Sequence, residues 1–439
     1  MFHVKHAPHI LLINPWITDF SAYNFWIRPL GLLYIASLLR ENGFEVTLID
    51  CLDYSSKIKK YGDGNFFKKR IEKPRPLDSI SRHYSRYGIP EGVLKERLTS
   101  ITKVDVIAVT SGMTYWYPGL FELIRMVKPF LNGAPVILGG IYATLCYEHA
   151  VKYSGADYVV KGRGETDGLK LISELTSCKI APNSELQTNP YPAFDLYPQL
   201  GFVCVATSRG CPLRCTYCAS HVLYNGFDRR EPDEVVEEID YWVTRHRINN
   251  IAFYDDALLV DPSRHIMPIL RKIIKRGIHC CFHTPNGLHV REMSEELADL
   301  LFRAGFRTIR LGFETSNEDM QIDTGGKVGN QELVRAIKNL KRAGYSGEEI
   351  GVYIMVGLPG QTIEEAEESV AFVQRSGARP IVVEYSPIPG TSLFKKAKQL
   401  SRFDLEREPL YHNNTILPCQ WEGFTMADYR RLKEGLRRR

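Results

Sequence analysis

The sequence lacks any long apolar run. Although 44% of its 439 residues are hydrophobic, the apolar stretch nearest the N-terminus is only Ile-Leu-Leu-Ile at 10–13, far short of a signal-peptide core or of the about 20 residues that cross a bilayer. No later stretch is long enough either. These absences predict a cytoplasmic protein without a transmembrane segment. In that reducing compartment, ten cysteines favour metal ligands or catalysts over disulfides.

A block of like charge is also missing. Lys and Arg number 56 against 51 Asp and Glu, and neither sign gathers into a long run, which argues against nucleic acid as a partner. The basic end RRLKEGLRRR at 430–439 favours a solvated helix end, with a role toward RNA or an anionic membrane as the alternative.

Short apolar runs alternate with amphipathic stretches along most of the chain, and this pattern predicts an α/β protein of more than one domain. In the first part, five runs rich in Val, Ile and Leu predict the buried parallel strands of one doubly wound, Rossmann-type domain. These runs cover 9–15, 44–50, 104–110, 134–140 and 156–162.

Two segments interrupt the alternation. Residues 54–100, rich in Lys, Arg, Tyr and Pro, are too long for an ordinary connection and predict an insertion that is either a lid or disordered. Residues 176–201 carry four prolines and little periodicity, which predicts a linker.

The second part of the chain alternates again, and its six predicted strands are fewer than the eight that close a full barrel. We therefore expect an open, partial barrel over 202–395 with strand-end loops on its active face, followed by a C-terminal extension, 396–439. The strands are expected near 202–207, 250–254, 279–283, 307–313, 350–356 and 380–385.

Three cysteines, Cys211, Cys215 and Cys218, stand within eight residues, directly after the first predicted barrel strand. A structural zinc site takes four ligands, and His221 could complete such a set, but zinc motifs usually come as two separated pairs. A four-iron cluster held by three cysteines leaves one iron open to a ligand from outside the protein. The triplet therefore favours a catalytic [4Fe-4S] cluster, with zinc as the alternative.

The run Cys-x3-Cys-x-aromatic-Cys, made by Cys211, Cys215, Tyr217 and Cys218, resembles the radical S-adenosylmethionine (SAM) superfamily. The resemblance implies that the open iron chelates the amino and carboxylate groups of SAM. It also implies that an electron from the reduced cluster splits SAM to a 5'-deoxyadenosyl radical, which takes a hydrogen atom from the substrate. An electron donor such as flavodoxin or ferredoxin is an expected partner.

Other strand-end motifs extend this resemblance over 202 to about 395. By it, Glu314 in IRLGFETSNE would bond the ribose or methionyl group of SAM, and the backbone around Gly357 to Gly360 would pass the adenosine. Where many members have Gly-Gly-Glu for the SAM ammonium, this chain has Asp255 and Asp256. Either carboxylate could accept the ammonium, and the alternative is that the pair caps the next helix.

The first part, 1–175 with the insertion, resembles the cobalamin-binding domain of B12-dependent radical SAM enzymes, through Asn14-Pro15, the stretch RPLGLLYIASLLRENGFEV and the Gly139-Gly140 strand end. Residues without bulk at strand ends let a large cofactor approach the backbone. The candidate cobalamin-contacting residues are Ser111, Gly112, Gly139 and Gly140.

One departure concerns the lower ligand of cobalt. Classical corrinoid domains carry Asp-x-His-x-x-Gly after the second strand, whereas this chain has Asp50-Cys51-Leu52-Asp53. Cobalamin is then expected without a protein imidazole, or is not bound at all, and His83 in the insertion is a remote candidate ligand. The aromatic run TYWYPG at 114–119 predicts packing, or a platform against a corrin face or an apolar substrate.

The resemblance implies methylation of an unactivated carbon in a small-molecule or lipid-like substrate. The first alternative is a cyclisation, desaturation or rearrangement with the first domain as scaffold. The second is a non-enzymatic zinc or RNA-binding protein, for which the strand-end motifs would be a coincidence. The sequence identifies no residue that acts on the substrate itself.

Overall fold

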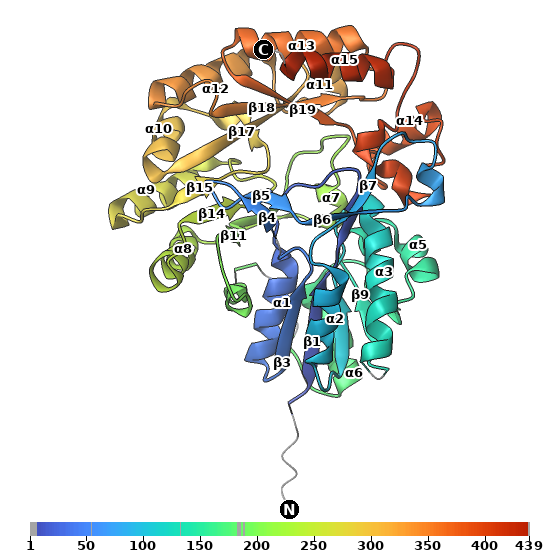
Figure 1. Cartoon of the computed structure of the whole chain (residues 1–439). Coiled ribbons are helices and arrows are strands. Elements are labelled where there is room, and N and C mark those ends of the chain that lie inside the picture. The colour runs from blue at the N-terminus through green and yellow to red at the C-terminus, as the bar shows by residue number, and fades with distance from the viewer. Residues whose placement is uncertain (1–6, 54, 132, 182–185, 188, 438–439) are drawn as a thin grey trace, which may run out of the picture. The chain divides into compact units, whose positions relative to one another are not determined.

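The computed structural model describes residues 7–53, 55–131, 133–181, 186–187 and 189–437, which form two compact units (Figure 1). Unit 1 runs to residue 200 and includes 407–410, and unit 2 comprises 201–406 and the residues from 411. None of the helices in the described ranges is long and apolar enough to cross a bilayer.

The sheet of unit 1 contains the five predicted strands, all parallel, in the order β10-β9-β8-β1-β3. Their bounds are β1 His9–Asn14, β3 Glu45–Asp50, β8 Val106–Val109, β9 Val136–Leu138 and β10 Tyr158–Val159. From the central strand β1 the chain first adds β3 on one side and then β8, β9 and β10 on the other. A topological switch point therefore lies between β1 and β8. In doubly wound folds, ligands bind at the carboxyl ends of the strands at this point.

Helices cover both faces of this sheet because successive side chains of a strand point to opposite faces. Leu11 and Ile13 join one buried cluster, and Ile10 and Leu12 join another. The helices of unit 1 are α1 Leu30–Glu41, α2 Glu91–Thr99, α3 Tyr117–Val127, α4 Ile141–Leu145, α5 Tyr147–Tyr153 and α6 Leu169–Thr176.

The insertion is folded, so the prediction that it could be disordered is wrong. It forms a hairpin of β4 and β5, and a second antiparallel sheet in the order β2-β7-β6, besides helix α2. The bounds are β2 Ile17–Asp19, β4 Ser55–Ile58, β5 Gly64–Phe66, β6 Lys68–Ile71 and β7 Tyr84–Tyr87. A small buried cluster of Leu52, Ile17, Phe66 and Tyr87 stabilises the insertion. The short segments that contain these apolar residues were not predicted as strands.

Unit 2 confirms the partial barrel. Its six main strands are parallel and follow chain order, β11-β14-β15-β17-β18-β19, with the short β16 Leu288–His289 beside β17. The strand bounds are β11 Val203–Val205, β14 Asn250–Phe253, β15 Cys281–His283, β17 Phe306–Glu314, β18 Ile350–Val356 and β19 Arg379–Glu384. The helices that alternate with them are α8 Pro232–His246, α9 Ile266–Arg276, α10 Glu295–Ala304, α12 Asn330–Ala343 and α13 Ile363–Arg375.

Shorter elements lie at the strand-end loops. Two strands, β12 Ser208–Gly210 and β13 Phe227–Arg229, pair as an antiparallel ribbon. The cysteine run and helix α7 Ser220–Leu223 lie between them along the chain. Helix α11 Glu318–Asp323 follows β17, and the chain ends with α14 Ser392–Leu400 and α15 Met426–Arg437. The basic end is helical as predicted up to Arg437, the last described residue, and Tyr429 and Leu432 are buried along α15.

Candidate functional site

The cysteine run begins where ribbon strand β12 ends. Gly210 adopts φ +79°, and a side chain there would place its Cβ 2.3 Å from the carbonyl oxygen of Gly226. Only glycine fits this crossing. The turn therefore fixes where Cys211 leaves the ribbon.

The three thiols are close enough to influence one another. Burial raises the pKa of Cys211 to about 11, and the charges of Cys215, Cys218 and Asp256 act in the same direction. The backbone N–H of Ser220 donates to Cys218 Sγ at 3.4 Å. All three thiols are free, so they can serve as thiolate ligands.

This donor set fits a cluster better than a single ion. Across the described residues, no three His, Cys, Asp or Glu side chains come together closely enough to hold one metal ion. A four-iron cluster instead binds each cysteine to a different iron. Three thiolates within one loop are the donor set of such a cluster, whereas a structural zinc site takes four ligands and usually comes as two separated pairs.

The residues after α11 hold the middle of the cysteine loop. The N–H of Thr216 donates to the carbonyl oxygen of Thr324 at 3.1 Å, and the Thr216 carbonyl accepts from Leu393 N at 2.9 Å. A Cβ on Gly325, whose φ is +116°, would lie 3.0 Å from Cys215 Cα. This close backbone approach requires the glycine.

Glu314, the predicted SAM-contacting carboxylate, ends β17 in a left-handed conformation, φ +75°. Its Oε1 accepts from Lys327 Nζ at 2.5 Å and from the Tyr217 hydroxyl at 3.2 Å. Lys327 Nζ also lies 5.5 Å from the centre of the Tyr217 ring. The structure thus brings Glu314 and Tyr217 together, as expected of one site.

Lys327 is the member of this site that the sequence analysis missed. Burial lowers its pKa, but the negative charges of Glu314 and Cys215 outweigh burial and raise it, so the ammonium keeps its proton. The only sequence signal is a lysine after the glycine pair in Thr-Gly-Gly-Lys, 324–327. That pattern is too common to indicate a cofactor site without the fold.

The two aspartates after β14 have different surroundings. Asp255 is 4% exposed, and its carboxylate accepts from Thr207 N at 3.1 Å, Thr207 Oγ1 at 2.7 Å and Ser208 Oγ at 2.6 Å. Asp256 is exposed, and it accepts from Ser220 Oγ at 2.8 Å. Asp255 therefore braces the start of the ribbon, whereas Asp256 faces the cysteine loop.

Neither aspartate caps a helix, so the capping alternative is wrong. The next helical turn begins at Pro262, and α9 begins at Ile266 with His265 before it. His265 is buried and lies 2.7 Å from Thr207 Oγ1 through its Nε2, which extends the bracing network around Asp255.

The loop after β18 is shaped by one buried amide. Gln361 Oε1 accepts from the N–H of Gly357 at 2.9 Å, and Gly357 and Gly360 have φ values of +77° and +92°. The backbone predicted to pass the adenosine therefore has a fixed form. It lies at the carboxyl end of the strand that neighbours β17.

In unit 1, the predicted cobalamin-contacting residues gather at the carboxyl ends of β8 and β9. Ser111 Oγ donates to the Gly139 carbonyl at 2.6 Å, and a Cβ on Gly140 would lie 2.5 Å from the Ser111 carbonyl. Beside Gly112 the ring of Trp116 would be 3.0 Å away, whereas nothing lies within 4 Å of a Cβ on Gly139. Gly139 thus offers open approach to the backbone.

Leu52 stands at the position where classical corrinoid domains have the cobalt-ligating histidine. Its side chain is buried in the apolar cluster of the insertion. Asp50 beside it accepts from Asn14 Nδ2 at 2.7 Å and the Tyr197 hydroxyl at 2.6 Å, and His83 is exposed on the insertion. These residues fit a corrinoid held without a protein imidazole.

The aromatic run 114–119 packs within unit 1. Tyr115 is buried, and Trp116 Nε1 donates to Asp19 Oδ2 at 2.8 Å. Tyr117 stacks on Tyr142 with ring centres 5.8 Å apart. Packing, the first of the two roles expected for this run, is what these contacts show.

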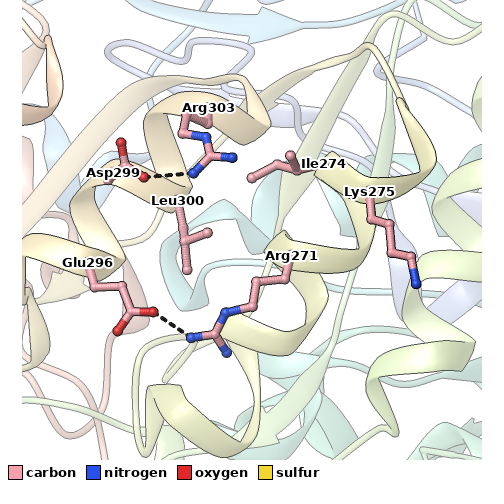
Figure 2. Close-up of a pocket in the computed structure, with 7 residues that line it drawn as sticks. All are labelled: Arg271, Ile274, Lys275, Glu296, Asp299, Leu300 and Arg303. Atoms are coloured by element: carbon pink, nitrogen blue, oxygen red, sulfur yellow. Dashed lines mark hydrogen bonds and ion pairs between the residues drawn. The ribbon is translucent and has the colours of Figure 1, made fainter.

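A hollow of about 300 Å³ lies between α9 and α10, away from these loops (Figure 2). Its charges are largely paired: Arg271 with Glu296 at 2.6 Å and Arg303 with Asp299 at 3.1 Å. Because barrel chemistry is built at the carboxyl ends of the strands and not on the outer helices, this hollow is not the catalytic site.

Two family models match the chain. Residues 205–373 match the radical SAM superfamily, and residues 95–169 match the B12 binding domain. Both agree with the predicted cofactors, a [4Fe-4S] cluster and SAM in unit 2 and cobalamin in unit 1.

Individual proteins match the chain at low sequence identity. An uncharacterized methyltransferase, PH0819, of Pyrococcus horikoshii is 24% identical over 91% of this chain and 82% of its own. The anaerobic magnesium-protoporphyrin IX monomethyl ester cyclase of Rubrivivax gelatinosus is 24% identical over 78% and 68%. The structure of the radical SAM methyltransferase TsrM of Kitasatospora setae, with tryptophan and a SAM analogue, aligns with TM-score 0.66 and 17% identity over 90% and 77%.

The chain therefore carries a B12 binding domain at 95–169 and a radical SAM domain at 205–373, and its three free cysteines stand where the radical SAM resemblance expects the cluster ligands.

Proposed function

We propose that the chain methylates an unactivated carbon of a small-molecule or lipid-like substrate. The observation that carries this proposal is the pairing of a three-cysteine loop with a B12-binding unit whose strand end is open at Gly139. When bound, the cluster supplies the electron that cleaves SAM, and the corrin supplies the methyl group. A flavodoxin or ferredoxin would deliver the electron.

The residues of unit 2 then have separate tasks. Cys211, Cys215 and Cys218 hold the cluster. Glu314 accepts hydrogen bonds from SAM, and Lys327 orients that carboxylate by donating to its Oε1. The fixed backbone from Gly357 to Gly360 accompanies the adenosine.

Asp256, rather than Asp255, is the proposed acceptor of the SAM ammonium, because the oxygens of Asp255 are already used by Thr207 and Ser208. Asp256→Asn is expected to weaken SAM binding about tenfold, the worth of one charge-assisted hydrogen bond, with little loss of stability. Asp255→Asn is expected to cost about 2 kcal/mol of unfolding free energy, since an amide cannot accept from all three donors. Equilibrium dialysis with SAM and denaturant unfolding measure the two effects. An Asp256→Asn enzyme with unchanged SAM affinity would overturn the assignment.

The reaction itself is tested with SAM carrying a deuterated methyl group and an extract of the native host as substrate source. We expect a product heavier by one CD3 unit, with 5'-deoxyadenosine and S-adenosylhomocysteine formed in near-equal amounts. The same reaction without cobalamin is the control and should give no labelled product.

The second candidate is a cyclisation, desaturation or rearrangement, supported by similarity to a protein named as a cyclase. Deoxyadenosine formed with turnover, but with neither S-adenosylhomocysteine nor label in the product, would favour this candidate over methylation.

A further inference from the structure

His289 ends the short strand β16, which pairs in parallel with β17 and sets His289 beside Gly312. Paired residues of neighbouring strands turn their side chains to the same face of a sheet, because the pleats of adjacent strands are in phase. His289 therefore shares a face with the Gly312 position. Gly312 stands two residues before Glu314, the last residue of β17, so this face lies at the end of the barrel where chemistry is built.

The ion pair of Glu314 and Lys327 lies on that same face. A Cβ on Gly312 would lie 3.1 Å from Lys327 Nζ and 3.5 Å from Glu314 Oε1. Burial, and then the positive charge of Lys327, lower the pKa of His289 to about 4, so the imidazole is neutral at neutral pH and close to the ammonium. His289, Lys327 and Glu314 thus form one group of polar side chains.

The imidazole of His289 is not satisfied by the protein. Its Nδ1 is buried and has no hydrogen-bond partner within the described residues. His283 on the neighbouring strand β15 shows the contrast, because its Nδ1 lies 3.2 Å from Thr308 Oγ1 and its Nε2 3.1 Å from Asn250 Oδ1. Buried polar groups are nearly always hydrogen-bonded, since leaving one unpaired is costly.

A role in packing alone gives no reason for a histidine at this position. An apolar side chain would fill the same space beside β17 without leaving a buried nitrogen unpaired. The side chain of His289 is half-buried, so one edge of its ring can reach a ligand. A ligand bound on this face would supply the partner that the protein does not.

The polar groups of SAM identify the one that fits this position. Asp256 is the proposed acceptor of its ammonium, and Glu314 accepts from its ribose or methionyl group, so both of these residues serve hydrogen-bond donors of SAM. The carboxylate of SAM is an acceptor with two oxygens and about four lone-pair sites, and chelation of iron leaves some of these sites for donors. The donors on the Gly312 face are the Lys327 ammonium and the imidazole N–H of His289.

We propose that His289 binds SAM by donating a hydrogen bond from its imidazole to the SAM carboxylate, beside the Lys327 ammonium. The negative carboxylate is attracted by Lys327, and the same positive charge disfavours protonation of the ring, which therefore keeps one donor and one acceptor. This inference adds a residue to the SAM site of the proposed function and rests on that site.

The test compares SAM with decarboxylated SAM, which keeps the adenosine, the sulfonium and the amine but has no carboxylate. Equilibrium dialysis against the protein loaded with its cluster measures both affinities. His289→Leu should lower the affinity for SAM about tenfold, the worth of one hydrogen bond to a charged group, and leave decarboxylated SAM unaffected. His289→Asn restores an N–H near the place of Nδ1 and should recover most of the SAM affinity.

Denaturant unfolding without SAM separates binding from folding. Because Nδ1 has no partner to lose, the unfolding free energy of His289→Leu should be unchanged or higher than that of the natural protein. The matched control is His279→Leu, at an exposed histidine just before β15, and it should bind both ligands as the natural protein does.

Unchanged SAM affinity in His289→Leu would overturn the inference. So would an equal loss of both ligands together with lower stability, which shows a structural role. These results leave the proposed function standing if the natural protein binds SAM, whereas a natural protein that carries its cluster and does not bind SAM overturns the proposed function and this inference with it.

Discussion

Replacing Cys211, Cys215 and Cys218 together by alanine is expected to abolish both iron binding and SAM cleavage. Each thiolate binds a different iron, so no partial set holds the cluster. Protein reconstituted without oxygen should contain about four irons per chain and absorb near 400 nm, as clusters of this type do, whereas the variant should be colourless. Iron analysis, the absorption spectrum and release of 5'-deoxyadenosine measure the three effects.

The control for this experiment is the triple change of Cys146, Cys178 and Cys280 to alanine. These thiols are also free and partly buried, but they lie outside the loop, so the control should keep its iron and its colour. Stoichiometric zinc without iron in the anaerobically purified natural protein would contradict the assignment of the cluster.

Glu314→Gln is expected to destabilise the enzyme by about 3 kcal/mol and to weaken SAM binding. The Glu314 and Lys327 side chains are 10% and 16% exposed, and removing one partner of a largely buried ion pair leaves the other charge without compensation. Denaturant unfolding under anaerobic conditions measures the stability, and equilibrium dialysis measures SAM affinity.

The double change Glu314→Gln with Lys327→Met separates the two effects. It removes both charges, so most of the lost stability should return, but SAM affinity should stay low because the carboxylate is still absent. If the double variant regains SAM binding, Glu314 serves only to neutralise Lys327. If Glu314→Gln alone is as stable as the natural protein, the ion pair contributes nothing to folding.

The eleven principal strands were predictable because buried parallel strands are continuous runs of Val, Ile and Leu. Helix starts were predictable where local chemistry sets them: Ser294 caps α10, and Thr362 with Glu365 forms the capping box of α13. The strands of the insertion were not predictable, because they are short and rich in lysine and tyrosine. Pairing of β4 with β5, and of β7 with β6 and β2, makes them strands rather than local propensity.

Some features of the candidate site could likewise be predicted from the sequence, and others could not. The spacing of Cys211, Cys215 and Cys218 within one loop, and their place after a barrel strand, are sequence properties and predicted the cluster. The sequence around Asp255 and Asp256 could not predict their different environments. The Asp255 carboxylate accepts hydrogen bonds from Thr207 and Ser208, which are about fifty residues away along the chain.

The sequence by itself determined the two α/β units, the cluster loop and the absence of an imidazole at Leu52, because each depends on residue type and spacing over short distances. Only the tertiary structure decided that Lys327 reaches Glu314 and that Thr207 and Ser208 occupy the oxygens of Asp255. Contacts of this kind depend on how strand ends and loops are brought together in space. How deeply a side chain is buried, and which charges lie near it, depend on its neighbours in space. The order of residues along the chain does not specify these neighbours.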